Sequence, residues 1–164
     1  MRFLDASILI RWGSATIAEA LKEDVSTCGY ILAKIHNGEE VVTSTLVKDE
    51  ALIWFSRYKS SRLVDFLRSL MALTGLKIVE PTIGDELEAT RLFGKHRLGI
   101  SDLINLSIMR RLGIREIYSL DKGFDDIPDI KRVFDELRLE EGYKSFISSL
   151  KNKHQANYED PQKP

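Results

Sequence analysis

The chain has 164 residues, the size of a single domain, of which 43% are hydrophobic, 30% charged and 9% aromatic. This ordinary globular composition excludes a wholly disordered or fibrous protein, and the formal net charge of −1 argues against a polybasic protein that coats nucleic acid. One cysteine, Cys28, excludes an intramolecular disulfide. Three histidines with no second His or Cys at ligand spacing exclude zinc-finger and zinc-protease sites.

The start of the chain does not have the pattern of an export or membrane segment. Asp5 falls inside what would have to be the apolar run of a signal peptide. No stretch approaches the ~18 uncharged apolar residues of a membrane-spanning helix. We therefore expect a cytoplasmic protein without membrane association.

In the first half of the chain, short apolar or β-branched runs alternate with segments of helical periodicity. The first strand ends at Asp5, and Ser7 is the expected N-cap of the helix that follows. In chain order the predicted elements are a strand at residues 3–4, a helix at 7–12, helical turns within 16–23, a helix at 26–35, a strand at 41–44, helices at 46–58 and 60–71, and a strand at 76–79.

The second half continues the alternation. Thr82 is the expected N-cap of a helix over residues 83–93, and Ser101 is the expected N-cap of a helix that Gly113 ends. A strand at 116–120, an acidic turn-rich segment at 121–129, a short strand at 133–134 and a helix at 143–150 complete the pattern.

Short strands separated by helices are typical of an α/β protein with a mostly parallel sheet, here of four to five short strands. We expect a single domain over residues 1–150 and a mobile polar tail over 151–164. Ligand sites of such sheets lie outside the carboxyl ends of the strands. Polar residues that follow strands are therefore the first candidates for a functional site.

Acidic residues occupy these positions. Asp5 and Asp121 each follow a predicted strand, and Asp125 lies four residues later. Glu50 lies early in the helix after the second strand, and Asp102 lies at the start of its helix. Each acid alone has a structural explanation, because a strand-ending Asp is often a turn residue and an acid in a first helical turn stabilises the helix by ~0.5 kcal/mol.

Together the acids favour a metal site. They adjoin apolar runs that should be buried, so the carboxylates should lie near the edge of the core. Clustered carboxylates repel one another, and some would be protonated unless a cation neutralises them. Because no His or Cys accompanies them, the natural cation is a hard, oxygen-seeking ion, Mg²⁺ or Mn²⁺. Such an ion activates water and neutralises charge on phosphate oxygens, as phosphodiester hydrolysis requires.

Four segments resemble, in order, the acidic motifs of the PIN-domain ribonucleases. The first is FLDASILI at residues 3–10, an apolar strand followed by Asp and then small or hydroxyl residues. The second is Ser44 with Glu50 six residues later, and the third is GISDLI at 99–104. The fourth is SLDKGF at 119–124, which resembles hydroxyl-x-Asp-x-x-Phe. The resemblance covers nearly all of residues 1–135, although residues 13–40 match no part of the pattern.

The resemblance implies a three-layer α/β/α fold with a central, mostly parallel sheet. It implies that Asp5, Glu50, Asp102 and Asp121 are catalytic and surround one or two Mg²⁺ or Mn²⁺ ions, with Asp125 as an accessory ligand. The implied activity is endonucleolytic cleavage of single-stranded RNA by a metal-activated water.

Hydroxyl groups and local cations complete the expected site. Ser7 and Ser119 would hold a carboxylate or water without touching the metal, although Ser119 stands where the family more often has Thr. RNA binding needs local positive charge, for which Arg11, Lys95 and Arg97 are the candidates because they adjoin motif residues. Ordinary surface charge is the alternative explanation of these three residues.

Many small PIN domains are toxins of VapBC-type toxin–antitoxin pairs. The resemblance therefore implies a homodimer and an antitoxin partner besides RNA. Others process or degrade RNA without a toxin role, and the sequence does not separate the two.

Two other functions fit parts of the sequence. A catalytically inactive PIN-fold domain that binds RNA or another partner would have the same fold, but all four acids are present. A phosphoacceptor signalling domain also gathers acids at strand ends, but it needs paired acids near the N-terminus, where Asp5 stands alone.

Overall fold

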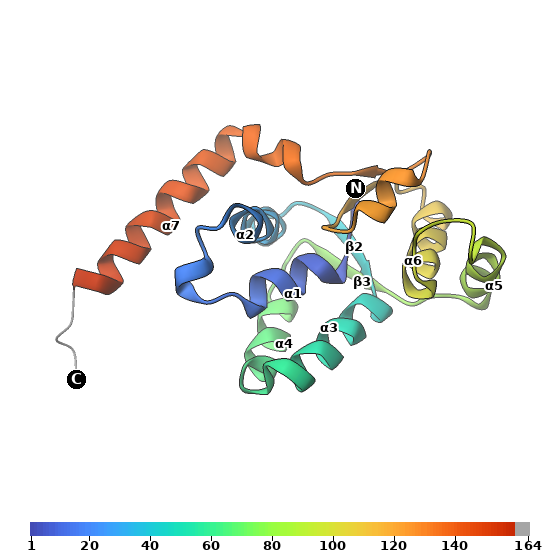
Figure 1. Cartoon of the computed structure of the whole chain (residues 1–164), viewed down its shortest axis with the longest axis horizontal. Coiled ribbons are helices and arrows are strands. Elements are labelled where there is room, and N and C mark those ends of the chain that lie inside the picture. The colour runs from blue at the N-terminus through green and yellow to red at the C-terminus, as the bar shows by residue number, and fades with distance from the viewer. Residues whose placement is uncertain (160–164) are drawn as a thin grey trace.

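The computed structural model describes the backbone of residues 1–159 and the side chains of residues 1–152. Five strands form one sheet in the order β3-β2-β1-β4-β5, and every neighbouring pair is parallel (Figure 1). The strands are β1 Arg2–Leu4, β2 Val41–Ser44, β3 Leu76–Val79, β4 Glu116–Tyr118 and β5 Lys131–Arg132. The predicted three-layer α/β/α architecture is confirmed.

Helical crossovers make the parallel pairing possible, because each helix returns the chain to the starting edge of the sheet. Helices α5 and α6 pack against each other at the right of Figure 1, while α1 contacts both α2 and α3 near the middle of the view. The helices are α1 Ala6–Ser14, α2 Glu23–His36, α3 Thr45–Tyr58, α4 Leu63–Met71, α5 Ile83–Leu92, α6 Ile100–Arg111 and α7 Glu141–Glu159. Within residues 1–159, no helix is both long enough and apolar enough to span a membrane.

The central strands are buried on both faces, as their continuous apolar sequences predict. Phe3 and Leu4 of β1 and Ile117 and Tyr118 of β4 are fully buried. In the order β2-β1-β4, the carboxyl ends of three strands meet at the middle of one sheet edge. Residues that follow these strands are therefore brought together.

Of the three predicted helix N-caps, one is confirmed and two are wrong. Thr82 caps α5 as predicted, since its Oγ1 accepts from the Asp85 amide at 3.2 Å. The expectation that Ser101 caps α6 is wrong, because Gly99 is the N-cap and Asp102 accepts from its amide. Ser7 is likewise not a cap: it lies inside α1, whose N-cap is Asp5.

The last strand and the tail also differ. The strand predicted at 133–134 lies at Lys131–Arg132, because the φ of −150° and ψ of −64° at Phe134 take the chain out of the extended conformation. Helix α7 continues to Glu159, so residues 151–159 of the predicted tail are helical, and residues 160–164 lie outside the described residues.

Helix α7 docks on α2 through its first two turns. Tyr143 OH lies 2.9 Å from Ser26 Oγ, and the Tyr143 ring meets Tyr30 edge-on. Phe146 packs beside both Tyr30 and Trp12. Trp12 is only partly buried but packs against the core, as its position after Ile8 predicts.

Gly29 provides a test of this packing. A Cβ at Gly29 would lie 2.7 Å from Trp12 Cε3, so Gly29→Ala should lower the free energy of unfolding by about 1–3 kcal/mol. Gly84→Ala is the matched control on α5, where the added Cβ meets only Thr82 Oγ1 at 3.5 Å and should be neutral or stabilise by up to ~1 kcal/mol. Urea unfolding measures both, and equal stabilities of the two variants would contradict this account of the α1–α2 contact.

Candidate metal centre

The four predicted acids lie around the carboxyl end of β1. Asp5 follows β1 directly, and Asp121 lies three residues after the end of β4. Glu50 lies on α3, which begins immediately after β2, and Asp102 lies in the first turn of α6. The parallel sheet thus gathers side chains that are up to 116 positions apart in the sequence, as 121 − 5 gives.

Asp5 is the most buried acid of the group, with 6% of its surface exposed. One oxygen, Oδ2, accepts a hydrogen bond from Ser119 Oγ at 2.8 Å and others from the hydroxyl and amide of Ser7. No Lys, Arg or His among the described side chains forms an ion pair with Asp5. A buried carboxylate without a counter-cation is unfavourable, so this position favours binding of a cation.

The two serines are held in place by the backbone after β4. Ser119 Oγ accepts from the Asp121 amide at 2.9 Å, and Ser7 Oγ accepts from the Leu120 amide at 3.0 Å. Because an ionised carboxylate only accepts hydrogen bonds, each hydroxyl donates its proton to Asp5 while its oxygen accepts a backbone N–H. The serines therefore fix Asp5 relative to the segment that carries Asp121.

Glu50 and Asp102 line one cleft between α3 and the start of α6. The cleft residues are Leu46, Asp49, Glu50 and Ile53 from α3 with Gly99, Ile100, Ser101 and Asp102 beside them. The Gly99 amide donates to Asp102 Oδ2 at 3.2 Å, which holds this carboxyl at the helix start. The cleft is open to solvent and can admit a ligand.

The acids are close enough to affect one another's ionisation. Burial, followed by the charge of Asp5, raises the pKa of Asp102 to about 6, with smaller contributions from Asp121 and Glu50. Partial burial of the Glu50 carboxyl and the charge of Asp5 raise its pKa as well. The fold thus keeps these carboxylates close together although they repel one another, and a bound cation would reduce that repulsion.

The donor set fits Mg²⁺ or Mn²⁺ by its chemistry. All four groups are carboxylates, which hard cations prefer. Among the described residues, no three His, Cys, Asp or Glu side chains are arranged as they stand to hold one metal ion. Binding would therefore require carboxylate side chains to rotate toward a shared ion.

Two predicted site residues are directed elsewhere. Both oxygens of Asp125 accept from Arg132, at 2.9 and 3.2 Å, so this carboxylate is engaged in an ion pair and does not join the other acids. Arg11 Nε donates to Asp24 Oδ2 at 2.6 Å, which directs the guanidinium toward α2. Both residues thus form ion pairs with side chains that the linear sequence does not show to be their neighbours.

Lys95 and Arg97 are exposed in the loop before α6, and neither forms an ion pair with a described side chain. This loop packs closely on the turn after Asp121, since a Cβ at Gly123 would lie 3.2 Å from the Arg97 carbonyl oxygen. Lys122, also exposed and without an ion-pair partner among the described residues, lies on the same turn. The rim beside Asp121 therefore carries unpaired positive charge.

Sequence reasoning missed Asn105, which lies one turn after Asp102 and is 2% exposed. Its Oδ1 accepts from Ser44 Oγ at 2.6 Å. The available signal was a single polar amide within the apolar run of α6.

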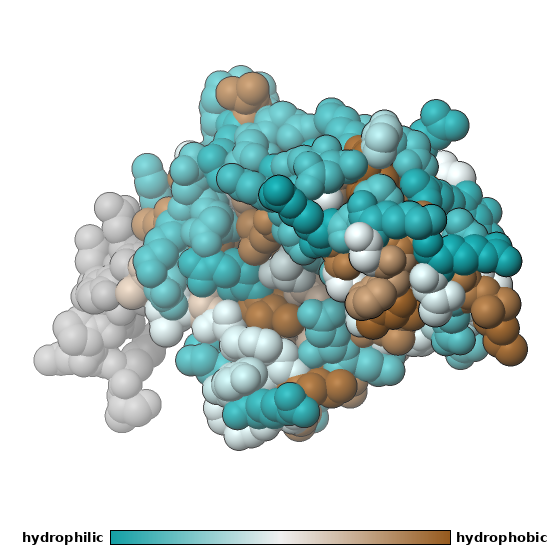
Figure 2. Space-filling view, turned by 45° about the vertical axis from the view of Figure 1, so that its right-hand side comes forward, coloured by the Kyte–Doolittle hydropathy of each residue, from teal (hydrophilic) through white to brown (hydrophobic). Residues whose placement is uncertain are grey.

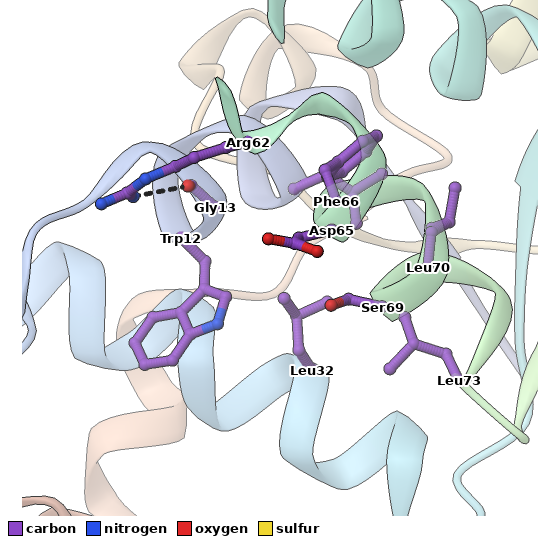
Figure 3. Close-up of a pocket in the computed structure, with 10 residues that line it drawn as sticks. Trp12, Gly13, Leu32, Arg62, Asp65, Phe66, Ser69, Leu70 and Leu73 are labelled. Atoms are coloured by element: carbon purple, nitrogen blue, oxygen red, sulfur yellow. Dashed lines mark hydrogen bonds between the residues drawn. The ribbon is translucent and has the colours of Figure 1, made fainter. Parts of the chain in front are cut away.

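A second hollow is separate from the acids. An apolar cavity of about 380 Å³ lies between the end of α1, α2 and α4 (Figure 3). Trp12, Leu32, Phe66, Leu70 and Leu73 line it, and Arg62 at its rim donates to the Gly13 and Ala15 carbonyls. None of the four predicted acids lines this cavity.

A family model described as PIN domain matches residues 2–130. The chain belongs to the PIN domain family. This confirms the resemblance inferred from the four acidic motifs, and it leaves α7 wholly beyond the matched residues of the PIN domain. A search of the curated proteins finds no match.

Solved structures share the PIN fold at low sequence identity. VapC20 of Mycobacterium tuberculosis, a toxin that cleaves the sarcin–ricin loop, has a TM-score of 0.66 at 19% identity, over 82% of this chain and 99% of that chain. A toxin–antitoxin complex from Klebsiella pneumoniae has a TM-score of 0.58 at 17% identity, over 80% and 96%. VapBC2 of Rickettsia felis, bound to a promoter DNA fragment, has a TM-score of 0.56 at 17% identity, over 82% and 98%.

Asp102→Asn should stabilise the metal-free PIN domain at pH 7. Because the folded-state pKa of Asp102 is raised to about 6, the folded protein binds this proton more tightly than the unfolded chain, so stability falls as the pH rises from about 4 to above 6. The asparagine of the variant does not ionise, so its free energy of unfolding should exceed that of the parent by about 1–3 kcal/mol at pH 7 and differ little at pH 4.

Urea unfolding in EDTA at the two pH values measures the effect. Asp65→Asn, which removes an exposed carboxylate on α4, is the control and should change stability by less than ~0.5 kcal/mol. A variant at Asp102 that is less stable than the parent at pH 7 would contradict the electrostatic account.

Proposed function

We propose that this PIN domain is an Mg²⁺- or Mn²⁺-dependent endoribonuclease that hydrolyses phosphodiester bonds of single-stranded RNA. The observation that carries the proposal is the buried, unpaired carboxylate of Asp5 beside Glu50, Asp102 and Asp121. The printed activity of the similar VapC20, cleavage of the sarcin–ricin loop, supports RNA as the substrate class.

In this proposal Asp5, Glu50, Asp102 and Asp121 hold the ion. When bound, it supplies a Lewis acid that activates water and neutralises charge on phosphate oxygens. Ser7 and Ser119 occupy Oδ2 of Asp5, which leaves Oδ1 as the oxygen free to face a ligand. The open cleft between α3 and α6 would admit the RNA backbone to the Glu50 and Asp102 carboxylates, which line it.

The RNA phosphates would be held by the cations of the rim beside Asp121. Arg97 and Lys95 of the loop and Lys122 of the adjoining turn provide charge opposite in sign to the phosphates. Overall the chain is nearly neutral, so attraction of RNA depends on this local charge. Arg11 has no part in this proposal because Asp24 binds its guanidinium.

We further propose a protein partner of the antitoxin class and a homodimer. The partner proposal is supported by the similar structures from Klebsiella pneumoniae and Rickettsia felis, a toxin–antitoxin complex and a VapBC2 assembly. Apolar side chains exposed on α5 and just after it, Ile83, Leu87 and Phe93, offer a face for a second copy. Figure 2, turned so that the side of Figure 1 holding α5 comes forward, shows apolar patches there among hydrophilic surface.

RNA cleavage by purified protein tests the proposed activity. The parent protein and Asp65→Asn should cleave labelled single-stranded RNA in Mn²⁺ or Mg²⁺ and lose activity in EDTA. Asp102→Asn should lower the rate by at least ~100-fold because an ion ligand is removed. Equal cleavage by the parent and Asp102→Asn would contradict the proposal. Metal binding without cleavage of any RNA would favour the inactive PIN-fold binding domain.

Arg97→Ala should weaken RNA binding without changing the chemistry. We expect KM to rise several-fold at nearly constant kcat, and the slope of log affinity against log salt to fall by about 1, as expected for one lost phosphate contact. Arg57→Ala removes an exposed cation about two turns beyond Glu50 on α3 and should change neither quantity. Identical salt slopes for Arg97→Ala and the parent would remove Arg97 from the RNA path.

A further inference from the structure

Helix α6 carries a buried amide that its apolar surroundings do not explain. Asn105 is 2% exposed and lies between Leu103 and Leu106, which are fully buried. Placing an amide in a core is unfavourable unless it is hydrogen-bonded, and an apolar residue would fill the position without that requirement. The amide therefore calls for a specific partner.

That partner is Ser44 at the end of β2. Ser44 Oγ donates to Asn105 Oδ1 at 2.6 Å and accepts from the Val47 amide at 3.1 Å. The same hydroxyl thus caps α3 and joins it to α6. Both residues are buried, so solvent does not compete with this link.

The link joins the two helices that carry two of the proposed metal ligands. Glu50 follows Ser44 by six residues, about 9 Å along α3, and Asp102 precedes Asn105 by three residues, about 4.5 Å along α6. The two acids face the same cleft from these two helices. The link therefore fixes α3 and α6 relative to each other close to the cleft that both carboxylates line.

We propose that Asn105 is a positioning residue that, through Ser44, holds the Glu50 and Asp102 carboxylates at the separation required to bind one ion. The inference rests on the proposed function, since it concerns the same metal centre. Asn105 itself touches neither substrate nor ion in this assignment.

Calorimetric titration with Mn²⁺ tests the inference on the full chain. Asn105→Leu keeps the branching and the number of side-chain heavy atoms and leaves Ser44 to cap α3, but it removes the acceptor that joins the helices. We expect its Mn²⁺ affinity to fall at least ~10-fold, the size of effect seen when a group that orients a metal ligand is lost.

Ser107→Ala is the matched control. Ser107 is buried on the same helix, but its hydroxyl donates to the Leu103 carbonyl of that helix at 2.9 Å and makes no link to α3. This variant should lose some stability yet keep Mn²⁺ affinity within ~3-fold of the parent. A merely structural role of Asn105 would give both variants the same small change in affinity.

A double-variant cycle tests whether Asn105 acts through Ser44. In the Ser44→Ala background, Asn105→Leu should weaken Mn²⁺ binding by less than ~3-fold, because the link is already absent. Full additivity of the two losses would overturn the proposed route.

RNA cleavage separates this inference from the proposed function. If the parent binds Mn²⁺ but cleaves no RNA, the proposed activity fails and the titrations still decide the role of Asn105. If Asn105→Leu binds Mn²⁺ as the parent does, the positioning role is overturned while the nuclease proposal stands. A parent that binds no Mn²⁺ overturns both.

Discussion

The hydrogen bonds that Ser7 and Ser119 donate to one oxygen of Asp5 hold a buried carboxylate at the carboxyl end of the central strand β1. Such a group is tolerated only where donors or cations offset its lost hydration. Here two hydroxyls satisfy Oδ2, and the backbone amides of Leu120 and Asp121 orient both hydroxyls. Among the described residues no cationic side chain forms an ion pair with Asp5, so the negative charge of Asp5 acts on the neighbouring carboxyl groups. That charge contributes to the raised pKa values of both Glu50 and Asp102.

The rest of the site follows from the geometry of parallel strands. The crossovers place the ends of β2, β1 and β4 side by side, and each end supplies an acid or a residue that orients one. Ser44 is an example, because it ends β2, caps α3 and bonds Asn105 of α6. Stability and the proposed metal binding oppose each other here. The repelling carboxylates destabilise the metal-free protein, and the same repulsion favours a cation when one is present.

Much of this was predictable from local patterns. The alternation of apolar runs and amphipathic segments predicted the α/β fold, and the four acidic motifs predicted the family. Side-chain pairing was not predictable, because Asp125 and Arg11 find their partners, Arg132 and Asp24, only in three dimensions. Asn105 was missed for a related reason, since the partner that explains its burial lies 61 positions away. The polar composition after residue 150 predicts no further helix, whereas the backbone of α7 remains helical to Glu159.

The most direct test of the account is the position of a bound ion. Crystals grown with Mn²⁺, measured at a wavelength that gives anomalous signal from manganese, locate the ion independently of any model of the chemistry. The account predicts a peak ~2.1 Å from Asp5 Oδ1, the usual distance for such small divalent ions, with Glu50 and Asp102 rotated to share it. A peak found only elsewhere, or none at Asp5 under saturating Mn²⁺, would contradict the assignment of these carboxylates to a metal centre.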